Sequence, residues 1–344
     1  MMNAEDICQE EQWLQVLKNL PSDLDQSARE GGALVRKRRV PNAAALIRVA
    51  LAYALTNLSI KDVAAWATAQ GVIKITGPSL FYRFRGMADW LATVLARILS
   101  DQCSLPKPSG FCVRVIDATV ITGPGSKGTD WRAHVLIDPV SGRFESVELT
   151  DNKGGESFSR IADRPGELDL GDRGYCTARG IASRVRAGAD VLVRVNPCSI
   201  KVCDLNKKRL NLGANEARVP RTGRRSWKVL IPVPPDMESK KGKAWKLHEA
   251  TDWIRARLVA TRTKPNTVLW LLTTVDKARL SDKAMVTLYR LRWQIELLFK
   301  RLKTLVGLGD LPTRDGPTAK TWILARLLAA AIAQRMVEPS GFSP

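Results

Sequence analysis

The first hundred residues carry apolar side chains with helical spacing and few residues typical of strands. Alanine and leucine recur three and four positions apart, which places them on one face of a helix. One segment begins at Ser59, three residues before Asp62, and ends at Gly71. This is the arrangement of a capping box and a helix stop. We therefore predict an all-helical domain over residues 1–105.

A second helix is expected directly after this one, in the sequence GPSLFYRFRGMADWL. Pro78 stands near its start, and Arg83 and Arg85 are expected to be exposed on it. Two helices in this order are compatible with a helix-turn-helix, in which the second helix enters the major groove of DNA. The connection VIKIT is long for such a turn, so a domain that only packs its helices is the alternative.

After residue 110 the pattern changes to the alternation of apolar and polar positions that indicates strands. FCVRVIDATVI, WRAHVLIDP and GRFESVELT predict three antiparallel strands. A strand in GELDLGDRGY, a helix from about Thr177 to Ala187 and a strand from Asp190 to Asn196 follow. This order is the one found in ribonuclease H-like folds. We predict an α/β protein whose ribonuclease H-like core, a mixed sheet flanked by helices, begins with residues 110–199.

Composition divides the remaining chain. Residues 200–262 are rich in lysine, arginine and proline, with short strand patterns, and we expect a basic, β-containing insertion there. TVLWLLTTV (Thr267 to Val275) predicts a buried strand, so residues 263–337 are expected to complete the core. Residues 338–344 are expected to form a short tail.

The chain of 344 residues has 54 lysines and arginines against 34 aspartates and glutamates, a formal net charge of +20. A charge of this size is expected of a protein that binds a polyanion, and double-stranded DNA is the simplest choice. Six cysteines stand without a C-x2-C pair, and the two histidines, His134 and His248, lie near no nucleophile-elbow pattern. Zinc sites, disulfides and a Ser-His-Asp triad are therefore not indicated, and both histidines are expected to be structural.

The most apolar run, Trp322 to Val337, is short and contains Arg326 and Arg335. We expect no membrane span. The N-terminus is acidic and lacks a basic leader followed by an uninterrupted apolar segment, so no secretion signal is expected. The protein is therefore expected to stay in the cytoplasm.

Residues 288–303, LYRLRWQIELLFKRLK, predict an amphipathic helix with a crowded polar face. At about 100° per residue, its leucines and isoleucine form one apolar stripe. The polar residues beside that stripe fall within an arc of roughly 60°, and they are Tyr289, Arg292, Glu296 and Lys303. Surface ion pairs four residues apart are the alternative explanation, but a purely solvated face would scatter its charges more widely.

Two aspartates lie at positions that the strand pattern does not explain. Asp117 lies inside the first predicted strand, where an apolar residue is the default, and Asp172 ends the strand LDLGD before a turn. A basic partner for Asp117 and a turn-capping role for Asp172 are the structural alternatives.

Together with Glu296, the two aspartates would bring three carboxylates to one site of the predicted core. Like charges brought together repel one another unless cations are bound. Oxygen ligands without histidine or thiolate suit Mg²⁺ or Mn²⁺. Two such ions support the cleavage and transfer of phosphodiesters.

These motifs resemble those of the DDE transposases of the insertion-sequence-four family. The helix matches the Tyr-x2-Arg-x3-Glu-x6-Lys signature of that family, while VIDATVI and GDRGY resemble the motifs around its first and second catalytic aspartates. The resemblance covers about Arg114 to Leu305. It implies three catalytic residues that bind two Mg²⁺ or Mn²⁺ ions, namely Asp117, Asp172 and Glu296.

The same resemblance assigns DNA contacts. It implies that Arg292 and Lys303 hold phosphates beside the cleaved bond and that Tyr289 positions the transferred end. Trp270 resembles a tryptophan of the family that stacks on a base flipped out of the DNA. A tryptophan that only fills the core is an equal alternative for Trp270.

The implied activity is DNA transposition. The protein would bind the terminal inverted repeats of an insertion sequence through residues 1–105, nick the DNA by metal-assisted hydrolysis, and join the freed 3′ ends to target DNA. A homodimer on paired ends is expected by analogy. Family members usually continue with further helices, whereas this chain stops soon after Val337. A truncated, non-catalytic derivative that binds DNA and inhibits transposition is therefore the alternative, and a metal nuclease that cleaves without joining is a third possibility.

Overall fold

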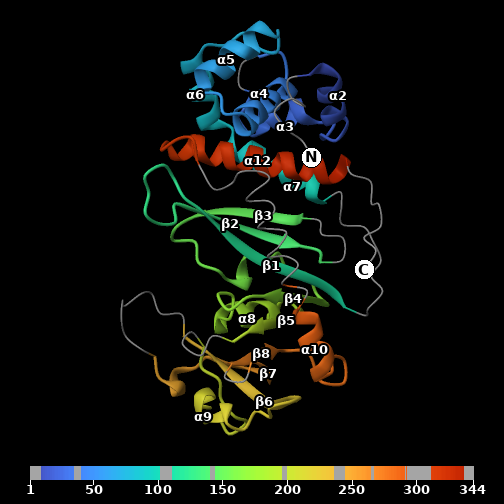
Figure 1. Ribbon diagram of the computed structural model, residues 1–344, viewed down its shortest axis with the longest axis vertical. Helices are drawn as coiled ribbons and strands as arrows, with labels where there is room; N and C mark the ends of the chain where they lie inside the picture. Colours follow the sequence, from blue (N-terminus) through green and yellow to red (C-terminus); the bar gives the residue numbers. More distant parts are fainter. Residues whose placement is uncertain are drawn as a thin grey trace.

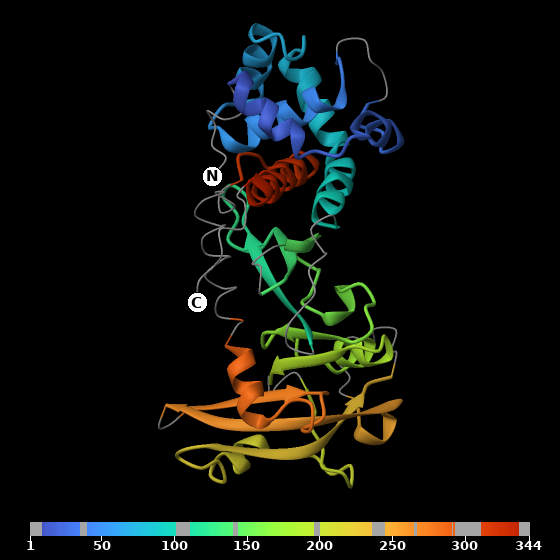
Figure 2. The same ribbon diagram turned by 90° about the vertical axis from the view of Figure 1, so that its right-hand side faces the viewer.

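The protein is described by a computed structural model that covers residues 9–34, 40–100, 111–139, 144–195, 200–235, 245–264, 267–290, 292 and 311–336. Helices from the first hundred residues lie at one end of the molecule, and an eight-stranded sheet occupies most of the rest (Figure 1). A long helix from late in the chain lies between the two parts in both views (Figure 2). The mixed α/β class predicted from the sequence is confirmed.

The N-terminal part of the described chain is built from helices. They are α2 (Glu10–Lys18), α3 (Leu24–Glu30), α4 (Ala43–Leu55), α5 (Ile60–Ala69), α6 (Gly77–Gly86) and α7 (Ala88–Ser100). Ser59 is the N-cap residue of α5, and its hydroxyl takes part in two hydrogen bonds to Asp62, so the N-cap half of the predicted capping box forms. The Ser59 hydroxyl accepts a hydrogen bond from the Asp62 amide at 3.2 Å and donates one to the Asp62 carboxylate at 2.6 Å. This exchange satisfies an amide that has no partner within the helix.

Helix α12 (Gly316–Met336) comes from late in the chain, yet it packs against α4, α6 and α7. Lys320 pairs with Asp89 at 2.7 Å, and the Thr321 hydroxyl donates to the carbonyl of Phe84 at 2.5 Å. The buried apolar side chains of α12 belong to the same core cluster as those of the N-terminal helices. Residues 316–336, which we grouped with the sheet, therefore join the helical part to it.

The sheet has the strand order β3-β2-β1-β4-β5-β8-β7-β6. Its strands are β1 (Cys112–Ile121), β2 (Trp131–Ile137), β3 (Phe144–Asp151), β4 (Glu167–Gly171), β5 (Asp190–Arg194), β6 (Arg224–Val233), β7 (Asp252–Lys264) and β8 (Thr267–Thr273). β1, β2 and β3 form the predicted antiparallel set, while β4 pairs in parallel with β1 and β5 in parallel with β4. The other described helices are α8 (Ala178–Arg186), α9 (Leu212–Glu216), α10 (Asp282–Tyr289), η1 (Phe158–Arg160) and η2 (Leu247–Glu249).

The strands expected in a separate insertion extend the same sheet. β7 pairs with β8, and it crosses the boundary that we expected at residue 262. β6 pairs with β7 and is the outer strand, with exposed side chains at Arg224, Arg225 and Lys228. Basic residues on an outer strand discourage pairing with another sheet and remain available to an anionic partner.

Alternation along β1 gives the sheet two buried faces. Val113 and Val115 belong to the core cluster shared with the N-terminal helices and α12. Ile116 belongs to a second cluster on the opposite face, together with Ile181 of α8. Because successive side chains of a strand point to opposite faces, Asp117 lies on the face of Val115.

Among the helices of the described residues, none is long and apolar enough to cross a membrane.

One ion pair is fully buried between α8 and the sheet. Arg184 and Asp169 are both 0% exposed, and Nε of Arg184 donates to the Asp169 carboxylate at 2.6 Å. Nη1 of Arg184 also donates to the carbonyl of Ala162 at 3.0 Å. Burial raises the pKa of Asp169 to about 6, and the charge of Arg184 opposes this rise. Removal of one partner would leave the other in the core without compensation.

Replacing Arg184 with methionine is expected to lower the free energy of unfolding by about 3–5 kcal/mol, because Asp169 would stay buried without its cation. The Arg184→Met/Asp169→Leu double variant should regain much of this loss. Chemical denaturation of the wild type and both variants measures the two effects. Equal stability of Arg184→Met and the wild type would show that the pair does not hold α8 on the sheet.

Candidate active site

Two of the predicted site residues lie at the same level of neighbouring parallel strands. In the pairing of β1 with β4, Val115 lies opposite Leu170. Asp117 and Asp172 each follow two residues later, and adjacent strands are about 4.8 Å apart. Asp172 stands directly after the end of β4, while β1 continues to Ile121. The structure therefore brings Asp117 and Asp172 together.

Asp172 is held in a tight turn between two glycines. Its Oδ1 accepts a hydrogen bond from the Gly174 amide at 2.7 Å, which is the capping role named above as the structural alternative. A Cβ atom at Gly171 would lie 2.7 Å from the ring of Phe158 and 2.8 Å from Cβ of Tyr175. Only glycine fits this approach, so the start of the turn is pressed against two buried aromatic residues.

Asp117 is half-buried within β1, and its Oδ1 accepts a hydrogen bond from the amide of Ala118 at 2.9 Å. Its direct cross-strand neighbour is Val135, which belongs to the same core cluster as Tyr289 at the end of α10. Asp117 therefore lies on the face of the sheet against which the end of α10 packs.

Tyr289 and Arg292 lie together near Asp172. Tyr289 is 7% exposed and Arg292 is 8% exposed, with the guanidinium carbon 5.7 Å from the centre of the tyrosine ring. Burial raises the pKa of Tyr289 to about 12, Arg292 opposes the rise, and the charge of Asp172 adds to it. The charge of Asp172 thus acts on the Tyr289 hydroxyl.

The other two residues of the predicted helix face, Glu296 and Lys303, lie outside the described residues. Their assignments as catalytic carboxylate and phosphate contact remain predictions.

Trp270 lies in the core on β8. It is 5% exposed, and its ring is 5.4 Å from that of Trp227 on β6, measured between centroids. Both tryptophans belong to the core cluster on the α8 side of the sheet. This is the place expected of a tryptophan that fills the core, and a base could stack on Trp270 only after its neighbours move.

A further carboxylate, which no sequence pattern singled out, lies beside Asp172. A Cβ atom at Gly174 would fall 1.6 Å from Oε2 of Glu156 and 3.1 Å from Oδ1 of Asp172, so the two carboxylates approach the same point. Burial raises the pKa of Glu156, and the charge of Asp172 raises it further. Arg132 is the ion-pair partner of Glu156, at the long distance of 4.0 Å. The only signal in the sequence is a glutamate after two glycines, GGESF, behind a predicted strand.

The chemistry of this set suits divalent cations. Carboxylate oxygens are the ligands that Mg²⁺ and Mn²⁺ prefer, and a bound cation would relieve the repulsion that raises the pKa of Glu156. Within the described ranges, no group of three or more His, Cys, Asp or Glu residues is arranged to hold a metal ion. The third predicted ligand, Glu296, lies outside those ranges.

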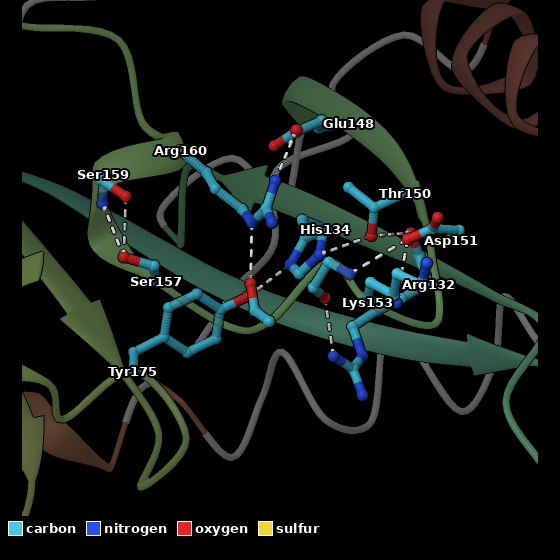
Figure 3. Close-up of polar contacts among 12 residues, drawn as sticks. Arg132, His134, Glu148, Thr150, Asp151, Lys153, Ser157, Ser159, Arg160 and Tyr175 are labelled. Carbon is cyan, nitrogen blue, oxygen red and sulfur yellow. Dashed lines mark hydrogen bonds and ion pairs between the residues drawn. The ribbon is translucent and has the colours of Figure 1, made fainter. Parts of the chain in front are cut away.

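A buried hydrogen-bond network surrounds His134 (Figure 3). His134 pairs with Ala118, the residue after Asp117, so it lies on the opposite face of the sheet from Asp117. His134 of β2 is 2% exposed, and its Nδ1 and Nε2 lie 3.2 Å from the hydroxyls of Tyr175 and Thr150, respectively. The Thr150 hydroxyl donates its single proton to the carbonyl of Arg132 at 3.4 Å. We therefore assign Nε2–H as the donor to Thr150 and Nδ1 as the acceptor from Tyr175.

Charge and burial keep His134 neutral. Burial lowers its pKa to about 4, and the nearby cations Arg160 and Arg132 lower it in the same direction. The structural role expected for this histidine agrees with its buried, neutral state. Its partner Tyr175 has a raised pKa because of burial and because of the charges of Glu156, Asp117 and Asp172, so the network reaches the carboxylate site.

Comparison with known proteins identifies similar transposases. Residues 108–332 match the family of the transposase DDE domain. The putative transposase InsL for insertion sequence element IS186A of Escherichia coli (strain K12) is 32% identical over 351 residues, which cover 95% of this chain and 94% of that protein. The transposase for insertion sequence element IS421 of Escherichia coli is 32% identical over 352 residues, with the same shares covered.

Among solved structures, a piggyBac transposase synaptic complex with hairpin DNA, determined by cryo-EM, aligns with a TM-score of 0.47 and 11% identity. The alignment covers 96% of this chain and 73% of that chain.

His134 is expected to weaken the protein at acidic pH. Its pKa is about 4 in the folded chain against 6.5 for the free side chain, so its stabilising contribution is complete above about pH 6.5 and is lost as the pH falls toward about 4. This contribution is on the order of 3 kcal/mol. The His134→Gln variant should show a flatter dependence of the unfolding free energy on pH over that window. Because the chain has two histidines, NMR titration reports the pKa directly, and a His134 signal that titrates near its ordinary value would contradict this expectation.

Proposed function

The chain belongs to the family of DDE transposases, enzymes that cleave DNA and transfer its strands, and we propose that it acts on the ends of its own element, an insertion sequence of the insertion-sequence-four family. It binds the terminal inverted repeats, nicks the DNA there by metal-dependent hydrolysis, and joins the freed 3′ ends to target DNA. The observation that carries this proposal is the parallel pairing of β1 with β4, which sets Asp117 beside Asp172.

The sheet supports a ribonuclease H-like catalytic core. Strands β1 to β3 are antiparallel, and β4 and β5 then add in parallel on the other side of β1. This is the arrangement that three hairpin strands followed by alternating helices and strands imply. In this reading β6 and β7 are an insertion whose strands continue the core sheet.

Asp117, Asp172 and Glu296 are the proposed catalytic residues and would hold Mg²⁺ or Mn²⁺, two ions in each active site. When bound, such ions activate the attacking water or 3′-hydroxyl and stabilise the leaving oxygen. The protein contributes two carboxylates that are fixed at the spacing of neighbouring strands. They are therefore already oriented before DNA binds.

The predicted helix over residues 288–303 supplies the proposed contacts to DNA. Arg292 and Lys303 hold phosphates beside the cleaved bond, and Tyr289 positions the transferred strand. The guanidinium carbon of Arg292 lies 5.7 Å from the centre of the Tyr289 ring, and a planar guanidinium can donate two parallel hydrogen bonds to a phosphate. The effect of Asp172 on the pKa of Tyr289 supports this position beside the scissile bond.

Helix α6 is the best candidate to read the inverted repeats. Tyr82 is 68% exposed, and Arg85 is exposed on the same helix. Aromatic and guanidinium groups on a helix that follows α5 suit the second helix of a helix-turn-helix, which enters the major groove. Arg83 has a different task, since it donates to the carbonyl of Ala33 at 3.0 Å and so ties the helices together.

Two ends must be cut together, so a homodimer on paired ends is part of the proposal. The mass of the complex between the protein and end DNA tests it, and a single protomer in the active complex would exclude it. The site of action is the bacterial cytoplasm, on chromosomal DNA.

Purified protein with Mg²⁺ or Mn²⁺ is expected to nick labelled DNA that carries the inverted repeats flanking its gene. Asp117→Ala, Asp172→Ala and Glu296→Ala should each lower the rate about a thousandfold or more, as loss of a catalytic carboxylate does, without loss of end binding. Asp276→Ala is the matched control, because this aspartate is exposed and far along the chain from the two catalytic aspartates. Gel separation of nicked and joined products measures both reactions.

The alternatives predict other products. Tight binding of the ends without cleavage by the wild type would favour a non-catalytic derivative that occupies them. Cleavage without joined products would favour a nuclease of the same fold.

Trp270 tests the proposed stacking on a flipped base. Because the ring is buried, Trp270→Ala is expected to destabilise the protein by about 3–5 kcal/mol, so Trp270→Phe, which keeps a packed ring, is the matched control. We expect Trp270→Ala to slow end cleavage about tenfold or more at a temperature at which both variants are folded. Unchanged cleavage by folded Trp270→Ala would leave this tryptophan with a packing role alone.

A further inference from the structure

The turn that carries Asp172 is anchored by the residue that ends its motif, Tyr175. This side chain is 0% exposed, and its ring lies 5.6 Å from that of Phe158, measured between centroids. Its Cβ also faces Gly171 so closely that no side chain fits there. The hydroxyl of Tyr175 therefore occupies a fixed place, three residues beyond Asp172.

That hydroxyl is bound to the sheet through His134. The contact of 3.2 Å to Nδ1 and the second contact of 3.2 Å from Nε2 to Thr150 connect the turn with β2 and, through β2, with β3 (Figure 3). A neutral imidazole can do this, because it offers one acceptor and one donor at the same time. The pKa of about 4 keeps His134 in that form at neutral pH.

Hydrogen bonds also hold the loop after β3 beside this network. Nη1 of Arg132 donates to the carbonyl of Gly154 at 2.7 Å, and Nε of Arg160 donates to the carbonyl of Gly155 at 2.8 Å (Figure 3). These bonds fix the backbone that precedes Glu156. The carboxylate of Glu156 is thereby held against Gly174, inside the turn of Asp172.

Such an anchor has a physical reason. Tyr175 lies within the electrostatic reach of Glu156, Asp117 and Asp172, and carboxylates at this spacing repel one another before a cation arrives. The turn after β4 is outside the strand ladder, so backbone pairing does not resist this repulsion there. A buried hydrogen bond to a neighbouring strand does resist it, and groups that orient metal ligands in this way change metal affinity about 10- to 100-fold when they are removed.

We propose that Tyr175, through its hydrogen bond to His134, is a positioning residue that holds Asp172 at the distance from Asp117 required for binding divalent cations. The proposal rests on the proposed function of the two aspartates as metal ligands. It assigns to the last residue of the GDRGY motif and to a buried histidine a role in the assembly of the site, while neither side chain touches the cation or DNA.

The direct test measures Mn²⁺ binding to the full-length protein without DNA by isothermal titration calorimetry. Tyr175→Phe deletes one hydroxyl and keeps the ring, and it is expected to weaken Mn²⁺ binding about tenfold or more. Tyr53→Phe is the matched control, since it also removes the hydroxyl of a buried tyrosine, stacked on Phe84 in the N-terminal helices. This control should bind Mn²⁺ as the wild type does. Mn²⁺ affinity equal to that of the wild type in folded Tyr175→Phe overturns the proposal.

Variants of His134 separate positioning from packing. His134→Asn places an acceptor oxygen near the position of Nδ1 and should retain most of the Mn²⁺ affinity, whereas His134→Leu should lose as much as Tyr175→Phe. Because the two residues act as one unit, the Tyr175→Phe/His134→Leu double variant should be no worse than either single variant. If Tyr175→Phe does not fold, the comparison of His134→Asn with His134→Leu decides, and equal affinities overturn the proposal.

Failure of the proposed function would look different. A wild type that binds Mn²⁺ but does not cut its ends refutes the proposed activity, while the affinities of the variants still decide the positioning role. If the wild type cuts its ends and Tyr175→Phe cuts them with the same dependence on Mg²⁺ concentration, the positioning role alone is refuted. A wild type that binds no Mn²⁺ and does not cut its ends refutes both.

Discussion

The parallel pairing of β1 with β4 is the constraint on which the candidate active site depends. It places two carboxylates, Asp117 and Asp172, at the same level on strands about 4.8 Å apart. Such neighbours repel, and partial burial strengthens the repulsion because the local dielectric is low. The glycines around Asp172 let the turn approach Phe158 and Glu156. The end of α10 packs on one face of the sheet, and the His134 network supports the other.

Much of this arrangement follows from local pattern. Alternation predicted β1, β2 and β3, and the strands before Asp172 and around Val191 were expected on similar grounds. The spacing of Ser59 and Asp62 indicated the start of α5. These features depend on neighbours in sequence or on one buried face, which the pattern of apolar positions records. The pairing of the two aspartates followed from the motifs and from the resemblance to a family, since neither aspartate alone demanded a site.

The features that the sequence pattern did not predict depend on contacts between segments that are distant in the chain. The extension of the sheet by β6 and β7 requires the pairing of β7 with β8, and the place of α12 requires the surface formed by α4, α6 and α7. The signal for Glu156 was weak, because a glutamate behind two glycines is ordinary in a loop. The link from Tyr175 to His134 joins residues that are far apart in the chain, and spacing does not reveal such a contact.

The most direct measurement is anomalous X-ray scattering from crystals of the full-length protein with end DNA and Mn²⁺. The account predicts two Mn²⁺ positions in each active site, with oxygen ligands from Asp117, Asp172 and Glu296, and it predicts that both positions are lost in Asp117→Asn. Mn²⁺ bound elsewhere on the sheet, or retained in full by Asp117→Asn, would contradict it.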